Sequence, residues 1–256
     1  MSTAGLPEIL ALIPARGGSK GIPRKNLLPV AGRPLIAHSI RQAQQSRWIG
    51  RVLVSTDDEE IAAVAREWGA EVPFLRPAEL AGDLSPDIDA FRHALDWLRA
   101  HEGYAPELVV HLRPTGPVRR VALIDEAIER MRRHPEADAL RSVAGALQTP
   151  YKMWHLGEHG ELDPVLRIEG VRDCQSQPRQ QLPAVYWQNG YVDIVRPRAI
   201  LEQDSMWGTR VLGFVVDEPM LEIDYPDDLP AVEEALRRLE QGLPLTTAAR
   251  RGRHAV

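Results

Sequence analysis

The chain has 256 residues, of which 31 are basic and 36 acidic, for a formal net charge of −5 at pH 7. A composition of 44% apolar and 26% charged residues excludes a disordered or fibrous protein. The single cysteine, Cys174, excludes an intrachain disulfide and a multi-cysteine zinc site, and the negative charge argues against a general nucleic-acid binder. Because the first apolar run, 9–13, is too short for a signal peptide or a membrane span, we expect a cytoplasmic protein with no membrane partner.

Apolar runs of strand length alternate with stretches of helical periodicity, which is typical of a mainly parallel sheet flanked by helices. Strands are expected at 9–13, 51–55 and 108–112. Helices are expected at 34–46, 58–68, 88–98 and 121–133.

The pattern changes between residues 148 and 188, where glycine and proline are dense and short alternating runs predict hairpins. We interpret this segment as an inserted β-rich arm. Strands then follow at 211–216 and 221–223, and a helix begins near Pro226. The predicted organisation is the first part of an α/β domain, the arm, the completion of the domain and a flexible tail, at 1–147, 148–188, 189–242 and 243–256.

Positive charge is concentrated near the start of the chain. Residues 9–56 contain eight basic residues and no acidic one. A local positive potential of this kind suits a small polyanionic substrate. Arg41, Arg47 and Arg51 are interpreted instead as a solvated helix face. Only three basic residues of the whole chain are lysines, and Lys20 and Lys25 both lie in this segment.

The loop after the first strand, residues 14–26, combines three glycines within five residues with four basic side chains. Glycine frees the backbone to turn its N–H groups toward an anion, and open α/β sheets bind ligands at the carboxyl ends of their strands. The loop has neither the Walker A spacing nor the Gly-x-Gly-x-x-Gly spacing of dinucleotide sites. A phosphate cradle is the favoured interpretation, and a glycine-rich surface loop is the alternative.

Residues 15–26 fit the pattern Ala-Arg-x-x-Ser-Lys-Gly-x-Pro-x-Lys-Asn, and further motifs follow in order at 54–57, 75–81, 114–119, 177–183 with 189–190, and 222–224 with 228–229. Through these motifs the sequence resembles the CMP-N-acylneuraminate synthetases, which are cytidylyltransferases related to the CMP-KDO synthetases. The resemblance implies a Rossmann-like nucleotidyltransferase fold. It also implies that a sugar's anomeric hydroxyl attacks the α-phosphorus of CTP, with Mg²⁺ or another divalent cation such as Mn²⁺ as cofactor. A homodimer is implied as well, in which the arm of one subunit reaches the sugar site of the other.

The resemblance also assigns roles to individual residues. Arg16 and Lys25 are implied to contact the triphosphate and to stabilise charge as pyrophosphate leaves. Lys20 and Arg24 are expected at the edge of the site. The implied nucleotide-binding residues are Ala15, Arg16, Gly17, Gly18, Ser19, Lys25, Asn26, Arg76, Ser85 and Asp87. The implied sugar-binding residues are Arg113, Thr115, Lys152, Arg179, Gln180, Asn189 and Gly190.

The best candidate metal ligand is Asp224, with Glu222 second. Carboxylates two residues apart on an extended chain share a face and suit a hard cation. The family usually has aspartate where this chain has Glu222. A helix cap near Pro226 is the alternative role for Asp224.

Other positions depart from the family pattern on the sugar and base sides. Arg113 stands where the family has glutamine, and it could hold the sugar's carboxylate or pair with an internal acid. Asp87 stands where serine is expected, and residues 85–87 read equally well as an ordinary helix start. Asp193 replaces a tyrosine, which predicts a reshaped acyl pocket. His111 is interpreted as a satisfied core residue and Cys174 as a passive thiol.

The leading hypothesis is a cytidylyltransferase for a nonulosonic acid: sialic, KDN, legionaminic or pseudaminic. One alternative keeps the chemistry but uses KDO or another acidic acceptor, such as a phosphonate. The other is a catalytically silent nucleotide-binding module. The presence of both Lys25 and Asp224 argues against the silent module, because nucleotide binding alone does not need the metal carboxylate.

Overall fold

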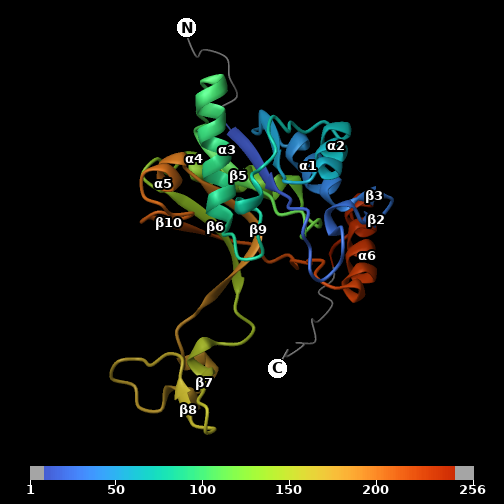
Figure 1. The fold of residues 1–256 in the computed structure, drawn as a ribbon. Coiled ribbons are helices and arrows are strands. Elements are labelled where there is room, and N and C mark those ends of the chain that lie inside the picture. The colour runs from blue at the N-terminus through green and yellow to red at the C-terminus, as the bar shows by residue number, and fades with distance from the viewer. Residues whose placement is uncertain (1–8, 246–256) are drawn as a thin grey trace.

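The computed structural model describes residues 9–245, and its core is one six-stranded sheet with the strand order β10-β6-β9-β5-β1-β4 (Figure 1). The pairs β1–β4, β1–β5 and β10–β6 are parallel, whereas β9 runs antiparallel to both β5 and β6. The strands are β1 (Ile9–Pro14), β4 (Arg51–Ser55), β5 (Leu108–His111), β6 (Ala139–Gly145), β9 (Tyr186–Val195) and β10 (Val211–Val215). The predicted mainly parallel sheet is confirmed.

Helices cover both faces of this sheet. Alternation along β1 sends Ile9, Ala11 and Ile13 to one face and Leu10 and Leu12 to the other. The first face packs against α1 (Leu35–Gln45), α2 (Glu59–Glu67) and α4 (Val121–Arg132), and the second against α3 (Asp87–Glu102) and α5 (Pro197–Leu201). Within residues 9–245, no helix has the length and apolar character needed to cross a membrane.

A third apolar cluster lies beside the main sheet. There α6 (Leu229–Glu240) packs on the small hairpin of β2 (Pro29–Val30) and β3 (Arg33–Pro34). In Figure 1 these elements gather next to α1. The turn Pro226–Asp228 leads into α6.

Local sequence explains where several helices begin and end. The Asp58 side chain accepts hydrogen bonds from the backbone N–H groups of Glu60 and Ile61, so it caps α2. Helix α3 ends at Gly103, whose φ of 63° is the left-handed conformation that glycine adopts without a Cβ penalty. The expected helices and the expected strands at 9–13, 51–55, 108–112 and 211–216 are all present within a few residues of their predicted bounds.

One strand prediction fails, and one strand was not predicted. Residues 221–223 form no ladder, and Ile223 N donates a hydrogen bond of 2.8 Å to Thr115 O. Strand β9 was not predicted from the sequence, because Asn189-Gly190 at its centre is a turn signal and Asp193 is a charged residue in a buried strand. Most of the predicted tail, residues 246–256, lies outside the described residues.

The arm between β6 and β9 projects away from the sheet (Figure 1). It holds an antiparallel pair of three-residue strands, β7 (Trp154–Leu156) and β8 (Leu162–Pro164), together with the turns Pro150–Lys152, Cys174–Ser176 and Arg179–Gln181. The predicted hairpin is present, but the arm holds less strand than expected, because Gly157 directly follows β7 and Pro164 ends β8.

Candidate active site

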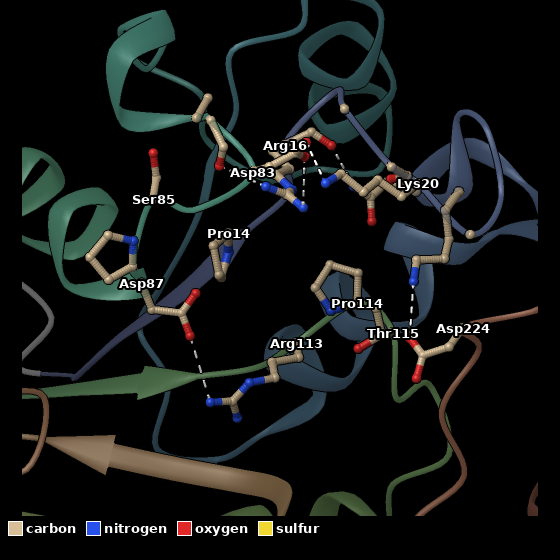
Figure 2. A pocket seen from close by; sticks show the side chains of 18 of the residues that line it. Pro14, Arg16, Lys20, Asp83, Ser85, Asp87, Arg113, Pro114, Thr115 and Asp224 are labelled. Atoms are coloured by element: carbon tan, nitrogen blue, oxygen red, sulfur yellow. Dashed lines mark hydrogen bonds and ion pairs between the residues drawn. The ribbon is translucent and has the colours of Figure 1, made fainter. Parts of the chain in front are cut away.

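A cavity of about 550 Å³ opens at the carboxyl ends of β1 and β5, where Pro14 and His111 line it. Its other walls come from the glycine-rich loop 16–26, the segment 80–87, the loop 113–115 and residues 224–225. This is where open α/β sheets bind their ligands. Figure 2 shows Arg16, Lys20 and Asp83 meeting at one rim, while Asp87 and Arg113 face each other across the floor.

Two basic side chains of the glycine-rich loop, Arg16 and Lys20, converge on the carboxylate of Asp83. Lys20 Nζ lies 2.8 Å from Asp83 Oδ2, and Arg16 Nη2 lies 3.5 Å from Asp83 Oδ1. Arg16 Nη1 also donates to Gly82 O at 2.7 Å. Asn26, which is buried, fixes the loop by donating from Nδ2 to Arg16 O at 3.0 Å. The loop is therefore joined to the segment 80–87 across the mouth of the cavity.

Lys25 and Asp224 form a second ion pair in the cavity, with Nζ and Oδ1 3.2 Å apart. The lysine side chain is only 14% exposed, whereas that of the aspartate is 54% exposed. Asp224 does not cap the following helix, because Asp228 Oδ2 accepts from the backbone N–H groups of Asp224 and Tyr225. The helix-cap alternative for Asp224 is therefore wrong, and its carboxylate is left facing the cavity.

Arg76 lines the cavity beside the end of β4. It is 7% exposed, and Nη2 donates to Ser55 O at 3.3 Å. Its Nε has no partner among the described residues, and burial lowers the pKa of the guanidinium from its usual value. A buried donor without an acceptor is costly unless a ligand supplies one. Ser85 and Asp87 line the same end of the cavity, and Asp87 also begins α3, so both of its predicted roles are compatible with its position.

The cavity floor rests on a buried carboxylate held by two arginines. Asp193 is fully buried, and its Oδ2 lies 2.7 Å from Arg113 Nη1 and 3.0 Å from Arg141 Nη1. Gln188 Nε2 donates to the same oxygen at 3.0 Å. Arg113 Nη2 is 3.7 Å from Asp87 Oδ2. Of the two roles predicted for Arg113, the structure shows the internal ion pair.

His111 also belongs to the floor and departs from its predicted role. It is 1% exposed, but neither ring nitrogen has a hydrogen-bond partner among the described residues. Burial, reinforced by the nearby Arg113, Arg141 and Arg119, holds its pKa well below the usual range, so the ring is neutral. It is therefore a buried residue, as expected, but not a satisfied one.

Comparison with known proteins decides the family. The cytidylyltransferase family model matches residues 10–161, more than half of the chain. The chain belongs to the cytidylyltransferase family. Its relatives include the CMP-N,N'-diacetyllegionaminic acid synthase of Legionella pneumophila, 34% identical over 91% of this chain and 98% of that protein. The N-acylneuraminate cytidylyltransferase of Escherichia coli is 31% identical over 85% of this chain and 49% of that protein. A solved CMP-2-keto-3-deoxy-manno-octonic acid synthetase in complex with CTP has the same fold, with a TM-score of 0.65 at 17% identity, over 91% of this chain and 99% of that one.

The cavity of this enzyme gathers most of the residues that the sequence places around the nucleotide. Ala15 and Gly17 are absent from its lining, since Ala15 is buried and Gly17 donates its N–H to Asp57 Oδ1 at 2.9 Å. Arg24 is turned away toward Asp58 and Glu60. The predicted site residues that do line the cavity are Arg16, Gly18, Ser19, Lys25, Asn26, Arg76, Ser85, Asp87, Arg113, Thr115 and Asp224.

The other predicted residues lie elsewhere. Lys152, Arg179 and Gln180 are on the arm. Asn189 is buried beneath the floor, and Gly190 adopts a φ of 68° with Arg113 Nη1 3.4 Å from the position of a Cβ. Glu222 is not in the cavity lining, so Glu222 and Asp224 do not present one shared face to it as expected. The extended strand that this expectation needed does not form.

Sequence reasoning missed Asp83, Arg141 and Tyr225 as parts of the site or its support. Asp83 carried a signal, because it is an acid that follows the 75–81 motif by two residues. The interpretation of Arg51 as solvated was wrong: its side chain is 11% exposed and pairs with Glu71 and Glu102.

The accessible carboxylate of Asp224 in the cavity is compatible with a bound divalent cation. Within residues 9–245, no three His, Cys, Asp or Glu residues come together to form a complete cage. One accessible carboxylate beside a triphosphate site is nevertheless a common way to hold Mg²⁺, which keeps waters and takes phosphate oxygens as its other ligands.

Gly21 is expected to tolerate no side chain. A Cβ there would lie 2.2 Å from Asp224 O, a backbone atom, so either the loop or the 224 segment must move. We expect Gly21→Ala to lower the free energy of unfolding by about 1–3 kcal/mol. Gly18→Ala is the matched control, because nothing lies within 4 Å of its added Cβ. Urea unfolding of both variants tests this, and equal stabilities would contradict the close approach.

Asp83 is expected to compete with the triphosphate for Arg16 and Lys20. Replacing it with asparagine removes a negative charge from the cavity mouth and frees both cations. We expect Asp83→Asn to bind CTP several-fold more tightly, since a single exposed ion pair contributes about 0–1 kcal/mol. Titration calorimetry measures the change, with Glu67→Gln as the exposed-acid control. Weaker CTP binding would instead mean that Asp83 orients the two cations.

Proposed function

We propose that the protein transfers a cytidylyl group from CTP to a nonulosonic acid, releasing pyrophosphate. The observation that carries the proposal is the cavity at the end of β1, which joins the basic glycine-rich loop, the Lys25–Asp224 pair and the buried Arg76. Relatives spanning nearly all of this chain support the choice of acceptor, because their names state that they make CMP-N,N'-diacetyllegionaminic acid.

The reaction forms a bond between the sugar's anomeric oxygen and the α-phosphorus and breaks the bond from that phosphorus to the pyrophosphate oxygen. The hydroxyl proton passes to solvent water as the new bond forms. Negative charge grows on the departing pyrophosphate, and Arg16 and Lys25 are the cations placed to offset it. We assign Arg76 to the cytosine base, because the resemblance implies that role and Arg76 lines the cavity together with Ser85 and Asp87.

Asp224 is the residue that would hold the magnesium ion, which supplies Lewis-acid stabilisation of the phosphate oxygens when bound. We expect Asp224→Asn to raise the Mg²⁺ concentration needed for half-maximal turnover by tenfold or more. Glu222→Gln, which alters an acid outside the cavity lining, should leave it within about twofold. The reverse order would make Glu222 the ligand. Manganese titrated in place of magnesium tests the identity of the metal.

The arm supports a homodimer. Large apolar side chains lie exposed along it, among them Leu147 at 77%, Leu156 at 74% and Leu162 at 58%. Exposed apolar surface of this kind marks an interaction site. Lys152, Arg179 and Gln180 lie on the same arm and line no part of this chain's own catalytic cavity. If they contact the sugar acid, that sugar acid is bound in the catalytic cavity of a second copy of the chain.

Complementation tests this arrangement. Lys25→Ala and Lys152→Ala should each be inactive as homodimers. In a co-expressed heterodimer one of the two sites would have its own Lys25 and an unaltered arm from the partner. We expect activity to return in the purified heterodimer, and light scattering to give twice the 28.6 kDa of the chain. A monomer, or no recovery in an isolated heterodimer, would contradict the proposal.

Pyrophosphate release with CTP and Mg²⁺ tests the activity itself, with sialic, legionaminic and pseudaminic acids, KDN and KDO supplied one at a time. We expect release with at least one nine-carbon acid and none without an acceptor. Release only with KDO would favour the alternative acceptor. CTP binding without release would favour the silent module. The cytoplasmic location expected from the sequence remains part of the proposal, because CTP is supplied there.

A further inference from the structure

A second cavity, of about 470 Å³, lies outside the catalytic site. It is an open cavity lined by α1, the start of α4 and the end of α6, with Arg33 from β3 at its edge. In Figure 1, α1, β3 and α6 gather on one side of the molecule. The ionisable residues of its lining are Arg33, His38, Arg41, Arg119, Arg120 and Glu240. Cavities of this size commonly hold small-molecule ligands.

The lining has a large excess of positive charge, with four arginines against one carboxylate. Glu240 is already paired with Arg33, with Oε1 and Nη1 2.7 Å apart. Arg120 pairs with Glu218, outside the lining. Arg41 has no hydrogen bond or ion pair with any described residue, although it was expected to be part of a solvated face. His38 adds no charge, because burial lowers its pKa.

Arg119 is the most informative residue of the cavity. It is 1% exposed, and its donors reach Ser39 Oγ, Gln42 Oε1 and two backbone carbonyls, but no carboxylate. Burial lowers its pKa to about 10, which still leaves it charged at neutral pH. The carboxylates that stabilise this charge, Glu222 and Asp193, both lie outside the cavity lining. Within the cavity the charge of Arg119 would attract an anion.

The start of α4 adds to the attraction. The first turn of α4 contains no acidic residue, and its N-terminus has no side-chain cap. Val121 and Ala122, the first residues of this 12-residue helix, line the cavity. Uncapped N–H groups at a helix N-terminus favour phosphate groups. This helix end and Arg41, which has no ion pair with a described residue, both favour a negatively charged ligand.

We propose that this cavity is a second anion-binding site, which takes the phosphoryl group of a small phosphorylated ligand and is distinct from the triphosphate site. One side chain links the two. Arg119 Nη2 donates to Arg113 O at 2.7 Å, and Arg113 lines the catalytic cavity. A ligand bound in the second site would therefore act, through Arg119, on Arg113 at the floor of the catalytic cavity.

Pyrophosphate titration calorimetry tests the site without relying on turnover. The Arg16→Ala/Lys25→Ala variant weakens the catalytic phosphate site, so the binding that remains reports on the second cavity. We expect this variant to keep one pyrophosphate site, and the addition of Arg41→Glu to weaken that site at least tenfold. Arg47→Glu, which reverses an arginine just beyond α1 and outside the lining, is the matched control.

Two outcomes would overturn the proposal: no pyrophosphate binding in Arg16→Ala/Lys25→Ala, or unchanged binding after Arg41→Glu. Arg41→Gln provides a milder variant if Arg41→Glu unfolds, and thermal unfolding of each variant identifies that case. Parallel titrations with inorganic phosphate and with a mononucleotide distinguish binding of a free anion from binding of a phosphorylated metabolite. Failure here would leave the proposed cytidylyl transfer untouched, because the assay measures binding at a different place.

Discussion

Replacing Lys25 with alanine is expected to lower kcat/KM for cytidylyl transfer by about 10²- to 10³-fold, the usual effect of removing one group that stabilises developing negative charge. Its ammonium group lies in the cavity beside Asp224, only 14% exposed, where solvent screens it weakly. Lys25→Arg should lose most of the activity as well, because a planar guanidinium cannot occupy the position of a compact ammonium.

Lys20→Ala is the control for this prediction. Its side chain is 74% exposed and pairs with Asp83 at the rim. We expect turnover to fall by no more than a few-fold when it is removed. Initial rates of pyrophosphate release at several CTP concentrations separate effects on kcat from effects on KM. Full activity in Lys25→Arg would show that a positive charge at this position is sufficient and that the geometry of the cationic group does not matter.

Asp193→Leu is expected to be the most destabilising substitution in the site, at about 3–5 kcal/mol, because it leaves Arg141 buried without its carboxylate and removes the nearest partner of Arg113. Asp193 is fully buried, and Arg141 is only 8% exposed. Chemical denaturation monitored by tryptophan fluorescence measures the loss. Arg113 should also lose its fixed position, so acceptor KM should rise more than CTP KM.

Two controls distinguish this buried network from an ordinary ion pair. Asp204→Asn removes the 82% exposed partner of Arg92 and should cost less than about 1 kcal/mol. Asp193→Leu combined with Arg141→Met replaces a buried pair by apolar groups and should recover much of the stability. Equal losses of unfolding free energy in Asp193→Leu and Asp204→Asn would mean that the buried Asp193 network stabilises the fold no more than an exposed ion pair does.

The sequence predicted those parts of the fold that local patterns determine. The helices at the start of the chain have clear apolar stripes and caps such as Asp58, and β1 is a short apolar run followed by glycines. Strand β9 could not be predicted in this way. It is central only because β5 and β6 flank it, and its buried charge is tolerated because Arg113, Arg141 and Gln188 all contact Oδ2 of Asp193.

The same distinction between local patterns and long-range contacts applies to the candidate site. The glycine-rich loop and Arg76 carry motifs that can be recognised one segment at a time. The partners that set their electrostatics come from far along the chain: Asp83 lies 63 residues after Lys20, and Asp224 lies 199 residues after Lys25. Pairing at such separations is a property of the fold, so Asp83 was missed. The role of Arg113 stayed open for the same reason until Asp193 was seen beside it.

One competition assay tests the central claim most directly. The enzyme is given CTP, Mg²⁺ and equal concentrations of N,N'-diacetyllegionaminic acid, sialic acid, pseudaminic acid and KDO, and the CMP-sugars are measured by mass spectrometry. The ratio of products gives the ratio of kcat/KM values for the acceptors. We predict that a CMP-nonulosonic acid dominates and that Lys25→Ala forms none above background. Predominance of CMP-KDO, or the absence of any CMP-sugar, would contradict the account.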